Sequence, residues 1–208
     1  MNSVLWAVYG TGFTFFMTAL GAAMVFFFRG AVRKGVQHVF LGFAAGVMIA
    51  ASVWSLLIPA IDQAEEQGMA GWVPAAGGFV LGGLFLLALD SLLPHLHLGE
   101  TKPEGVSSSF KRTTLLVFAV TLHNIPEGMA VGLAFALAAQ NTGDAPFSAA
   151  VALALGIGIQ NFPEGAAISL PLREEGLGTG KAFIGGALSG IVEPIFGILT
   201  VLVAGSVT

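Results

Sequence analysis

The chain has few charged residues and no cysteine. Only 10% of its 208 residues are Asp, Glu, Lys or Arg, whereas a soluble globular domain has about 25%. Without cysteine there is no disulfide framework, no thiolate nucleophile and no cysteine metal site. The eight basic residues and the formal net charge of −4 leave no basic patch for nucleic acid. The composition therefore argues against a soluble enzyme, a nucleic-acid-binding protein and a disordered segment.

Long apolar stretches make up most of the sequence. The chain is 55% hydrophobic, and each of six stretches exceeds the about 18 residues that distinguish a membrane span from a buried core helix. They cover residues 4–28, 39–61, 73–93, 113–139, 147–170 and 182–207. No stretch alternates with period two, and the first lacks the basic start and cleavage site of a signal peptide. The sequence predicts an all-α polytopic membrane protein, with residues 1–208 forming one domain of six transmembrane helices.

The basic residues predict the orientation of these spans. All of them fall in loops on one side of a six-span arrangement, namely Arg29, Arg33, Lys34, Lys102, Lys111, Arg112, Arg173 and Lys181. Loops that retain Lys and Arg face the cytoplasm. We therefore expect the loop of residues 94–112 to be cytoplasmic and both ends of the chain to be extracytoplasmic.

A motif is repeated inside the fourth and fifth stretches. Residues 123–128 read H-N-I-P-E-G and residues 160–165 read Q-N-F-P-E-G, so Asn, Pro, Glu and Gly recur after 37 residues. A carboxylate at the centre of a span costs about 2.5–3.5 kcal/mol on insertion scales. Both glutamates must therefore face the interior of the bundle, where a partner or a shared cation compensates their charge.

The spacing within each motif predicts a metal site between helices four and five. His123 and Glu127 are four residues apart, and Asn124 and Glu127 are three apart, so all three lie on one helix face. The same spacing recurs in Gln160, Asn161 and Glu164. Imidazole together with carboxylates suits Zn²⁺, and also Fe²⁺, Mn²⁺ or Co²⁺.

Two further features fit a transport site. Pro126 and Pro163 leave the carbonyls of Leu122 and Ile159 without a helical partner, so we expect both helices to kink there. Paired interruptions of this kind are typical of transporter binding sites. Glu193 is the other glutamate deep within a span, and we expect it to complete the site.

Pairs of small residues recur along the spans with a spacing of four. They are Gly42 with Gly46, Gly78 with Gly82, Gly128 with Gly132, and Gly186 with Gly190. This spacing lets membrane helices approach closely, so we expect helix packing at each pair.

These motifs resemble the ZIP (Zrt/Irt-like protein) family of divalent-metal transporters, in its prokaryotic branch. The resemblance covers the whole chain and is most specific in the two motifs and the Glu-Pro of the sixth span. It implies two adjacent metal positions midway across the membrane that share glutamates. The first would use His123, Glu127, Gln160 and Glu164, with Met48 nearby. The second would use Asn124, Glu127, Asn161, Glu164 and Glu193.

The resemblance also implies residues along the metal pathway. Ser55 and Asp62 would line the extracellular entrance, and His95 and His97 would receive the metal at the cytoplasmic exit.

The chain departs from the family pattern in two respects. The family has eight spans, so the last two are expected to be missing after Thr208. Prokaryotic relatives often carry Asp where this chain has Asn161, which leaves three glutamates to face up to four positive charges. We therefore expect either that the second position is weaker than the first or that the two are rarely full together.

The predicted function is transport of a divalent metal into the cytoplasm, with zinc as the main candidate and Fe²⁺, Mn²⁺ or Cd²⁺ as others. We expect no catalytic activity and no cofactor beyond the transported ion. The expected partners are the ion and the lipid bilayer, with no nucleic acid, and the glycine-rich faces permit a homodimer. The family branch favours a bacterial inner membrane.

Three other functions are alternatives. Buried glutamates also serve proton- or sodium-coupled carriers of other substrates. An intramembrane metalloprotease usually needs H-E-x-x-H, which this sequence lacks. A structural scaffold does not explain two glutamates placed at the centre of the membrane.

Overall fold

The computed structural model describes residues 3–28, 34–92, 94, 112–140 and 144–206, and this part of the chain consists of helices joined by short turns, without strands. Six helical segments are long and apolar enough to cross a membrane, which confirms the predicted all-α, six-span fold. They cover Ser3–Phe26, His38–Glu66, Trp72–Leu92, Thr113–Gln140, Pro146–Glu174 and Thr179–Gly205. Their ends lie within a few residues of the predicted ones, because long apolar runs determine where a span must lie.

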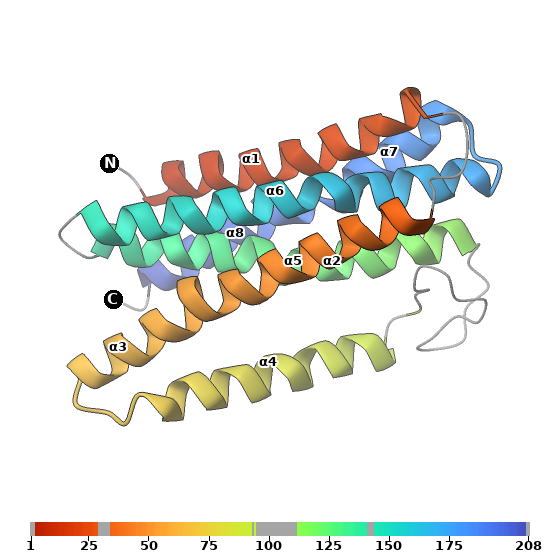
Figure 1. The fold of residues 1–208 in the computed structure, drawn as a ribbon. Helices are drawn as coiled ribbons and strands as arrows, with labels where there is room; N and C mark the ends of the chain where they lie inside the picture. The colour runs from red at the N-terminus through yellow and green to blue at the C-terminus, as the bar shows by residue number, and fades with distance from the viewer. Residues whose placement is uncertain (1–2, 29–33, 93, 95–111, 141–143, 207–208) are drawn as a thin grey trace.

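Figure 1 shows the helices that form these spans. They are α1 (Ser3–Ala22) with the short 3₁₀ helix η1 (Ala23–Phe26), then α2 (Lys34–Ala51), the π-helical η2 (Ser52–Leu57) and α3 (Ile58–Glu66), then α4 (Trp72–Leu92), α5 (Arg112–Gln140), α6 (Asp144–Glu174), α7 (Thr179–Ser189) and α8 (Val192–Ser206). Because η2 joins α2 to α3 without a break, the second span is one long rod.

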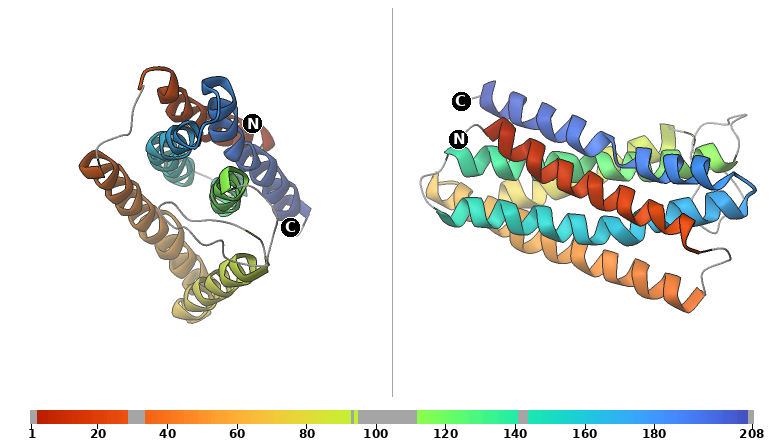
Figure 2. Two further views of the ribbon diagram at one scale, coloured as in Figure 1. Left: turned by 90° about the vertical axis from the view of Figure 1, so that its right-hand side faces the viewer. Right: turned by 90° about the horizontal axis from the view of Figure 1, so that it is seen from above.

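The described helices form a compact bundle and a more loosely attached pair. In the bundle α1 packs along α6 and α5 packs along α8, while α7 contacts α1 and α6. The rod of α2, η2 and α3 lies against α6, and α4 contacts mainly α3 (Figures 1 and 2). The site residues lie in the bundle.

The sixth span is broken where the sequence suggested one continuous helix. α7 ends at Ser189, and α8 begins at Val192. The Glu193 amide donates to the carbonyl of Gly190 at 3.0 Å, so the Ser189 carbonyl does not receive the usual helical hydrogen bond from Glu193. Pro194 reinforces the break because it has no N–H to continue the helical ladder. In contrast, α5 and α6 continue through Pro126 and Pro163, so the bend expected there stays a prediction.

Only half of the small-residue pairs mediate packing in the described part of the chain. A Cβ on Gly128 or Gly132 would overlap the α8 backbone, and one on Gly186 or Gly190 would come within 3.0 Å of its neighbours. The other four glycines have no neighbouring atom within 4 Å of the position that a Cβ would take, namely Gly42, Gly46, Gly78 and Gly82. The close pairs lie in the bundle, and the open pairs lie on α2 and α4.

Candidate metal site

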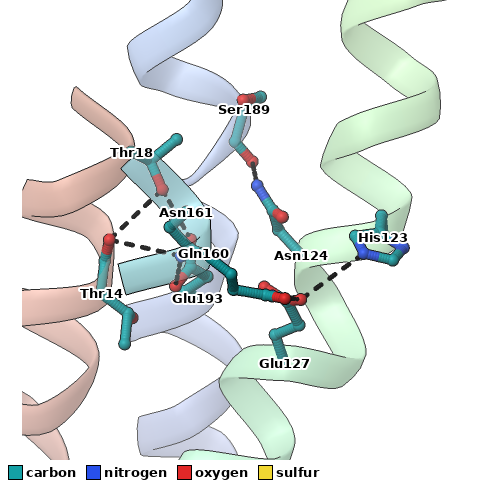
Figure 3. A network of polar contacts seen from close by, with 9 residues as sticks. All are labelled: Thr14, Thr18, His123, Asn124, Glu127, Gln160, Asn161, Ser189 and Glu193. Atoms are coloured by element: carbon teal, nitrogen blue, oxygen red, sulfur yellow. Dashed lines mark hydrogen bonds and ion pairs between the residues drawn. The ribbon is translucent and has the colours of Figure 1, made fainter. Parts of the chain in front are cut away.

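The repeated motifs place their polar side chains face to face on α5 and α6. His123 and Glu127 come from α5 and Glu164 comes from α6, and one potential ligand atom of each lies within 4.8 Å of the others. The Nε2 atom of His123 is 3.5 Å from Oε1 of Glu127, and Gln160 donates a hydrogen bond to the same oxygen. The side chains of the first motif therefore meet those of the second motif in one small volume. Figure 3 shows this for His123, Glu127 and Gln160.

Three amide side chains at the site have their N–H groups turned toward protein acceptors. Asn124 donates to the Ser189 carbonyl at 3.0 Å, and Gln160 donates to Glu127. Asn161 donates to Oε2 of Glu193 at 2.9 Å and to the Thr14 carbonyl at 3.3 Å. Because each amide nitrogen is engaged in this way, each amide oxygen is left as the free end of its side chain.

Four oxygen atoms at the site are buried and have no hydrogen-bond partner within the described structure. They are Oδ1 of Asn124, Oε2 of Glu127, Oε1 of Gln160 and Oδ1 of Asn161. A buried acceptor without a donor is costly, so native proteins rarely leave several together. Buried acceptors without donors, next to a histidine and two carboxylates, are an arrangement that a cation satisfies.

Glu193 lies on the other side of this network, next to α1. It is fully buried, and its Oε1 accepts a hydrogen bond from Thr18 at 3.2 Å while Oε2 accepts from Asn161 at 2.9 Å. Among the described residues it does not join the group of His123, Glu127 and Glu164. Its predicted role as a ligand of the second position stays a prediction.

The last residue of each motif brings a neighbouring helix to the site. A Cβ on Gly128 would overlap the backbone of Glu193 in α8. A Cβ on Gly165 would overlap the carbonyl oxygen of Thr18 in α1. Each copy of the motif therefore has two roles. It supplies polar side chains to the site, and its glycine lets one further helix pack closely there.

A cavity of about 400 Å³ reaches the site from one end of the bundle. Site residues line its inner part, namely Met48, His123, Gln160 and Glu164. The outer part is lined by apolar side chains such as Phe40, Leu116 and Pro171, which lie near the starts of α2 and α5 and the end of α6. The His123 side chain is 46% exposed, whereas that of Glu127 is 10% exposed. His123 is thus accessible from the cavity, and Glu127 lies behind it.

The two predicted entrance residues, Ser55 and Asp62, do not line this cavity. Ser55 lies in the π-helical turn η2, and Asp62 is an exposed residue of α3. His95 and His97 lie outside the described residues. Pro126 and Pro163 follow the Asn residues of their motifs within α5 and α6. The entrance and exit roles stay predictions.

Several known proteins that are similar to this chain are zinc transporters. No protein-family model matches the chain. The zinc transporter ZIP11 of Homo sapiens is 38% identical to it over an alignment covering 95% of this chain and 80% of the human protein. ZIP11 of Xenopus tropicalis is 40% identical with the same coverage. The chain belongs to the ZIP family. The zinc transporter GufA of Myxococcus xanthus is 37% identical over 88% of this chain and 71% of its own length.

Membership in the ZIP family and the six apolar helices support the conclusion that the chain is an integral membrane protein with a metal ion as its substrate. The related proteins are named as transporters, which points to a role other than that of an enzyme. The relatives come from animals and bacteria, so the assignment to the prokaryotic branch stays a prediction.

Sequence reasoning missed three contributors to the site of this ZIP protein. On α1, Thr18 donates to Glu193, and the Thr14 carbonyl accepts from Asn161. The Ser189 carbonyl at the end of α7 accepts from Asn124. One signal was present, because Thr11, Thr14 and Thr18 share a helix face of the first span and all three are fully buried. No sequence signal marks the Ser189 carbonyl, which is available to Asn124 only because the helix breaks there.

Proposed function

We propose that this chain moves a divalent metal ion, with zinc as the first candidate, across the membrane into the cytoplasm through the site on α5 and α6. The observation that carries the proposal is the group of His123, Glu127 and Glu164 next to four buried oxygens without hydrogen-bond partners. Protein acceptors of this kind replace the water shell of an incoming ion.

The donor set favours transition metals over Mg²⁺ or Ca²⁺. One imidazole with carboxylate and amide oxygens is a borderline ligand set, which suits Zn²⁺ and also Fe²⁺, Mn²⁺ or Cd²⁺. Met48 lines the same cavity, and its soft thioether favours the softer ions of this group. Zinc comes first because the related proteins are named zinc transporters.

In this proposal the site holds two adjacent positions that share Glu127 and Glu164. The first position takes ligands from residues that line the cavity, namely His123, Gln160 and Glu164, together with Glu127 and the nearby Met48. The second takes ligands from fully or almost fully buried residues, namely Asn124, Asn161 and Glu193, together with the two shared glutamates. The first position therefore borders the cavity, and the second lies deeper in the bundle.

The direction of access supports an inward-facing arrangement. The cavity extends from the site toward the end of the bundle where α2 and α5 begin and α6 ends. Lys34, Arg112 and Arg173 lie at this end, which the distribution of basic residues assigns to the cytoplasm. Toward the opposite end, the bundle is filled by a cluster of buried apolar side chains that includes Val131, Phe135, Leu153 and Ile157. An ion at the site can leave toward the cytoplasm, whereas the other path is closed.

Import requires a second arrangement that opens the other path. α1, α5, α6 and α8 meet through backbone contacts at glycines and so move as one body. The rod of α2, η2 and α3 with α4 is attached more loosely. Rocking of the bundle against this rod would expose the site to the entrance residues Ser55 and Asp62 in one state and to the exit residues His95 and His97 in the other. A bacterial inner membrane, extracytoplasmic ends and a homodimer are part of the same proposal.

A carrier of another substrate coupled to protons or sodium is the second candidate, because buried glutamates serve both kinds of transport. A metalloenzyme is disfavoured, because the described group contains only one histidine.

Uptake of radioactive zinc into proteoliposomes containing the purified full chain tests the proposal. We expect saturable uptake that Cd²⁺, Fe²⁺ and Mn²⁺ inhibit and excess Mg²⁺ does not. Uptake no faster than into protein-free liposomes, together with no zinc bound to the purified protein, would favour the carrier of another substrate.

A further inference from the structure

Thr18 on α1 contacts the most deeply buried acid of the site. Its hydroxyl lies 3.2 Å from Oε1 of Glu193, and Asn161 donates to the other carboxylate oxygen at 2.9 Å. Thr18 and Glu193 are both fully buried. Figure 3 shows Thr14 and Thr18 at one side of the network and His123 at the other. Both oxygens of Glu193 therefore have protein donors on the side of α1 and α6.

This arrangement separates Glu193 from the other two glutamates of the site. Glu127 and Glu164 share a group with His123, and among the described residues Glu193 is not part of it. We propose that Thr18 is a positioning residue that holds Glu193 toward α1 and thereby weakens the second metal position. The inference rests on the proposed metal-transport function and adds a residue that sets how many ions the site holds.

The position of Thr18 is fixed by close helix contacts. A Cβ on Gly165 of α6 would overlap the Thr18 carbonyl oxygen, and a Cβ on Gly190 at the break before α8 would come within 3.0 Å of the Thr18 side chain. Thr18 thus lies where three helices meet, and it cannot follow Glu193 if the carboxylate moves toward an ion.

The hydroxyl of Thr18 has a second acceptor within its own helix. It lies 3.3 Å from the Thr14 carbonyl oxygen, so its single hydrogen can bond either that carbonyl or Glu193. If Glu193 turns to bind a metal ion, Thr18 keeps a hydrogen bond. The hydrogen bond from Thr18 to Glu193 can therefore break and re-form. It competes with the ion for the carboxylate but does not prevent the ion from binding.

Asn161 also helps to keep the Glu193 carboxylate near α1. Its amide group donates to Glu193, whereas a carboxylate at this position would repel it. With Asn161 in place, Glu193 interacts with this amide and with the Thr14 and Thr18 side chains, and the second position lacks one negative charge. Both effects act in the same direction, toward one tightly bound ion.

The test compares zinc binding to the full-length chain and to three variants in detergent or nanodiscs. Thr18→Val keeps the branched shape and removes the hydroxyl, Thr18→Ser keeps the hydroxyl, and Thr11→Val makes the same change at a buried threonine whose hydroxyl bonds the Ala7 carbonyl. Titration calorimetry and zinc content after equilibrium dialysis give the number of ions bound and the affinity of each step.

We expect Thr18→Val to tighten the second binding step by about tenfold and to leave the first unchanged, because the ion no longer competes with a hydrogen bond to a charged group. Thr18→Ser and Thr11→Val are expected to bind like the wild type. A merely structural role of Thr18 would weaken both steps together. If Thr18→Val does not fold, Thr18→Ala removes the hydroxyl without adding a methyl group in its place.

Two results separate this inference from the proposed function. An unchanged or weaker second step in Thr18→Val, with the first step intact, would overturn the role of Thr18 and leave the metal site standing. If the folded wild-type chain binds no zinc at all, both the site and this inference are wrong.

Discussion

The side-chain amide of Asn124 donates a hydrogen bond to the carbonyl oxygen of Ser189, 3.0 Å away, at the point where the sixth span breaks. The corresponding residue of the second motif, Asn161, donates to the carbonyl of Thr14 in α1. Each copy of the motif therefore uses its Asn to bind the backbone of a neighbouring helix and directs the amide oxygen elsewhere. The two asparagines thus stabilise the bundle and offer ligand atoms at the same time.

Replacing Asn124 by Ala is expected to destabilise the bundle. The Ser189 carbonyl would lose its donor inside the protein, and such a loss costs about 1–3 kcal/mol. Thermal unfolding of the purified chain in detergent measures this as a lower midpoint. Ser189→Ala is the matched control, because it leaves the backbone carbonyl in place and removes only the hydroxyl bond to the Gly186 carbonyl. If both variants unfold at the wild-type temperature, the bond from Asn124 does not support the helix break.

Gly165→Ala is expected to prevent close packing of α6 against α1. The added Cβ would overlap the Thr18 carbonyl oxygen, and backbone cannot move aside as a flexible side chain does. Overpacking of this kind typically costs about 1–3 kcal/mol and sometimes more. Gly46→Ala makes the same change on α2, where the space is open, and is expected to be neutral or stabilising. The two variants are compared by their unfolding temperatures and by the yield of monodisperse protein. Equal behaviour of the two variants would contradict the close crossing at Gly165.

Sequence patterns were sufficient to predict the six spans and to expect His123, Glu127 and Glu164 close together. Apolar runs long enough to cross the bilayer determine the spans, since no other structure satisfies the backbone there. The cost of burying Glu127 and Glu164 implied that they face each other, and the i,i+4 spacing placed His123 on the same face. These inferences depend only on local periodicity and on the energy of burial.

Contacts between distant segments were beyond this reasoning. The pairing of Glu193 with Thr18 joins residues 175 positions apart, and nothing local to either residue specifies its partner. The break before Val192 was missed because Pro194 looks the same in sequence as Pro126 and Pro163, through which the helices continue. The open glycines of α2 and α4 show the same limit, because a small-residue spacing permits a close contact without identifying the helix that makes it.

Metal affinity is expected to fall as the pH is lowered. His123 must be neutral to donate a lone pair and the glutamates must be ionised, so protons compete with the metal for the same atoms. Zinc binding measured by calorimetry between about pH 8 and about pH 5 covers the range in which histidine ordinarily changes charge. Thermal stabilisation by zinc gives an independent reading, since an ion that binds only the folded protein raises its unfolding temperature. Affinity that stays constant or rises at acidic pH would contradict coordination by imidazole and carboxylate.

Glu127→Ala and Glu164→Ala are each expected to abolish zinc uptake into proteoliposomes. Glu127 is the carboxylate nearest His123 and accepts from Gln160, and Glu164 supplies the carboxylate of the facing helix, so either change removes a charge from both proposed metal positions. Glu174→Ala is the matched control, because this exposed carboxylate lies at the end of α6, away from the group. Uptake of radioactive zinc is measured alongside zinc content of the purified protein, which separates loss of binding from loss of movement. If the double variant lacking both glutamates imported zinc as fast as the wild type, the ion would have to cross by a path other than the one between α5 and α6.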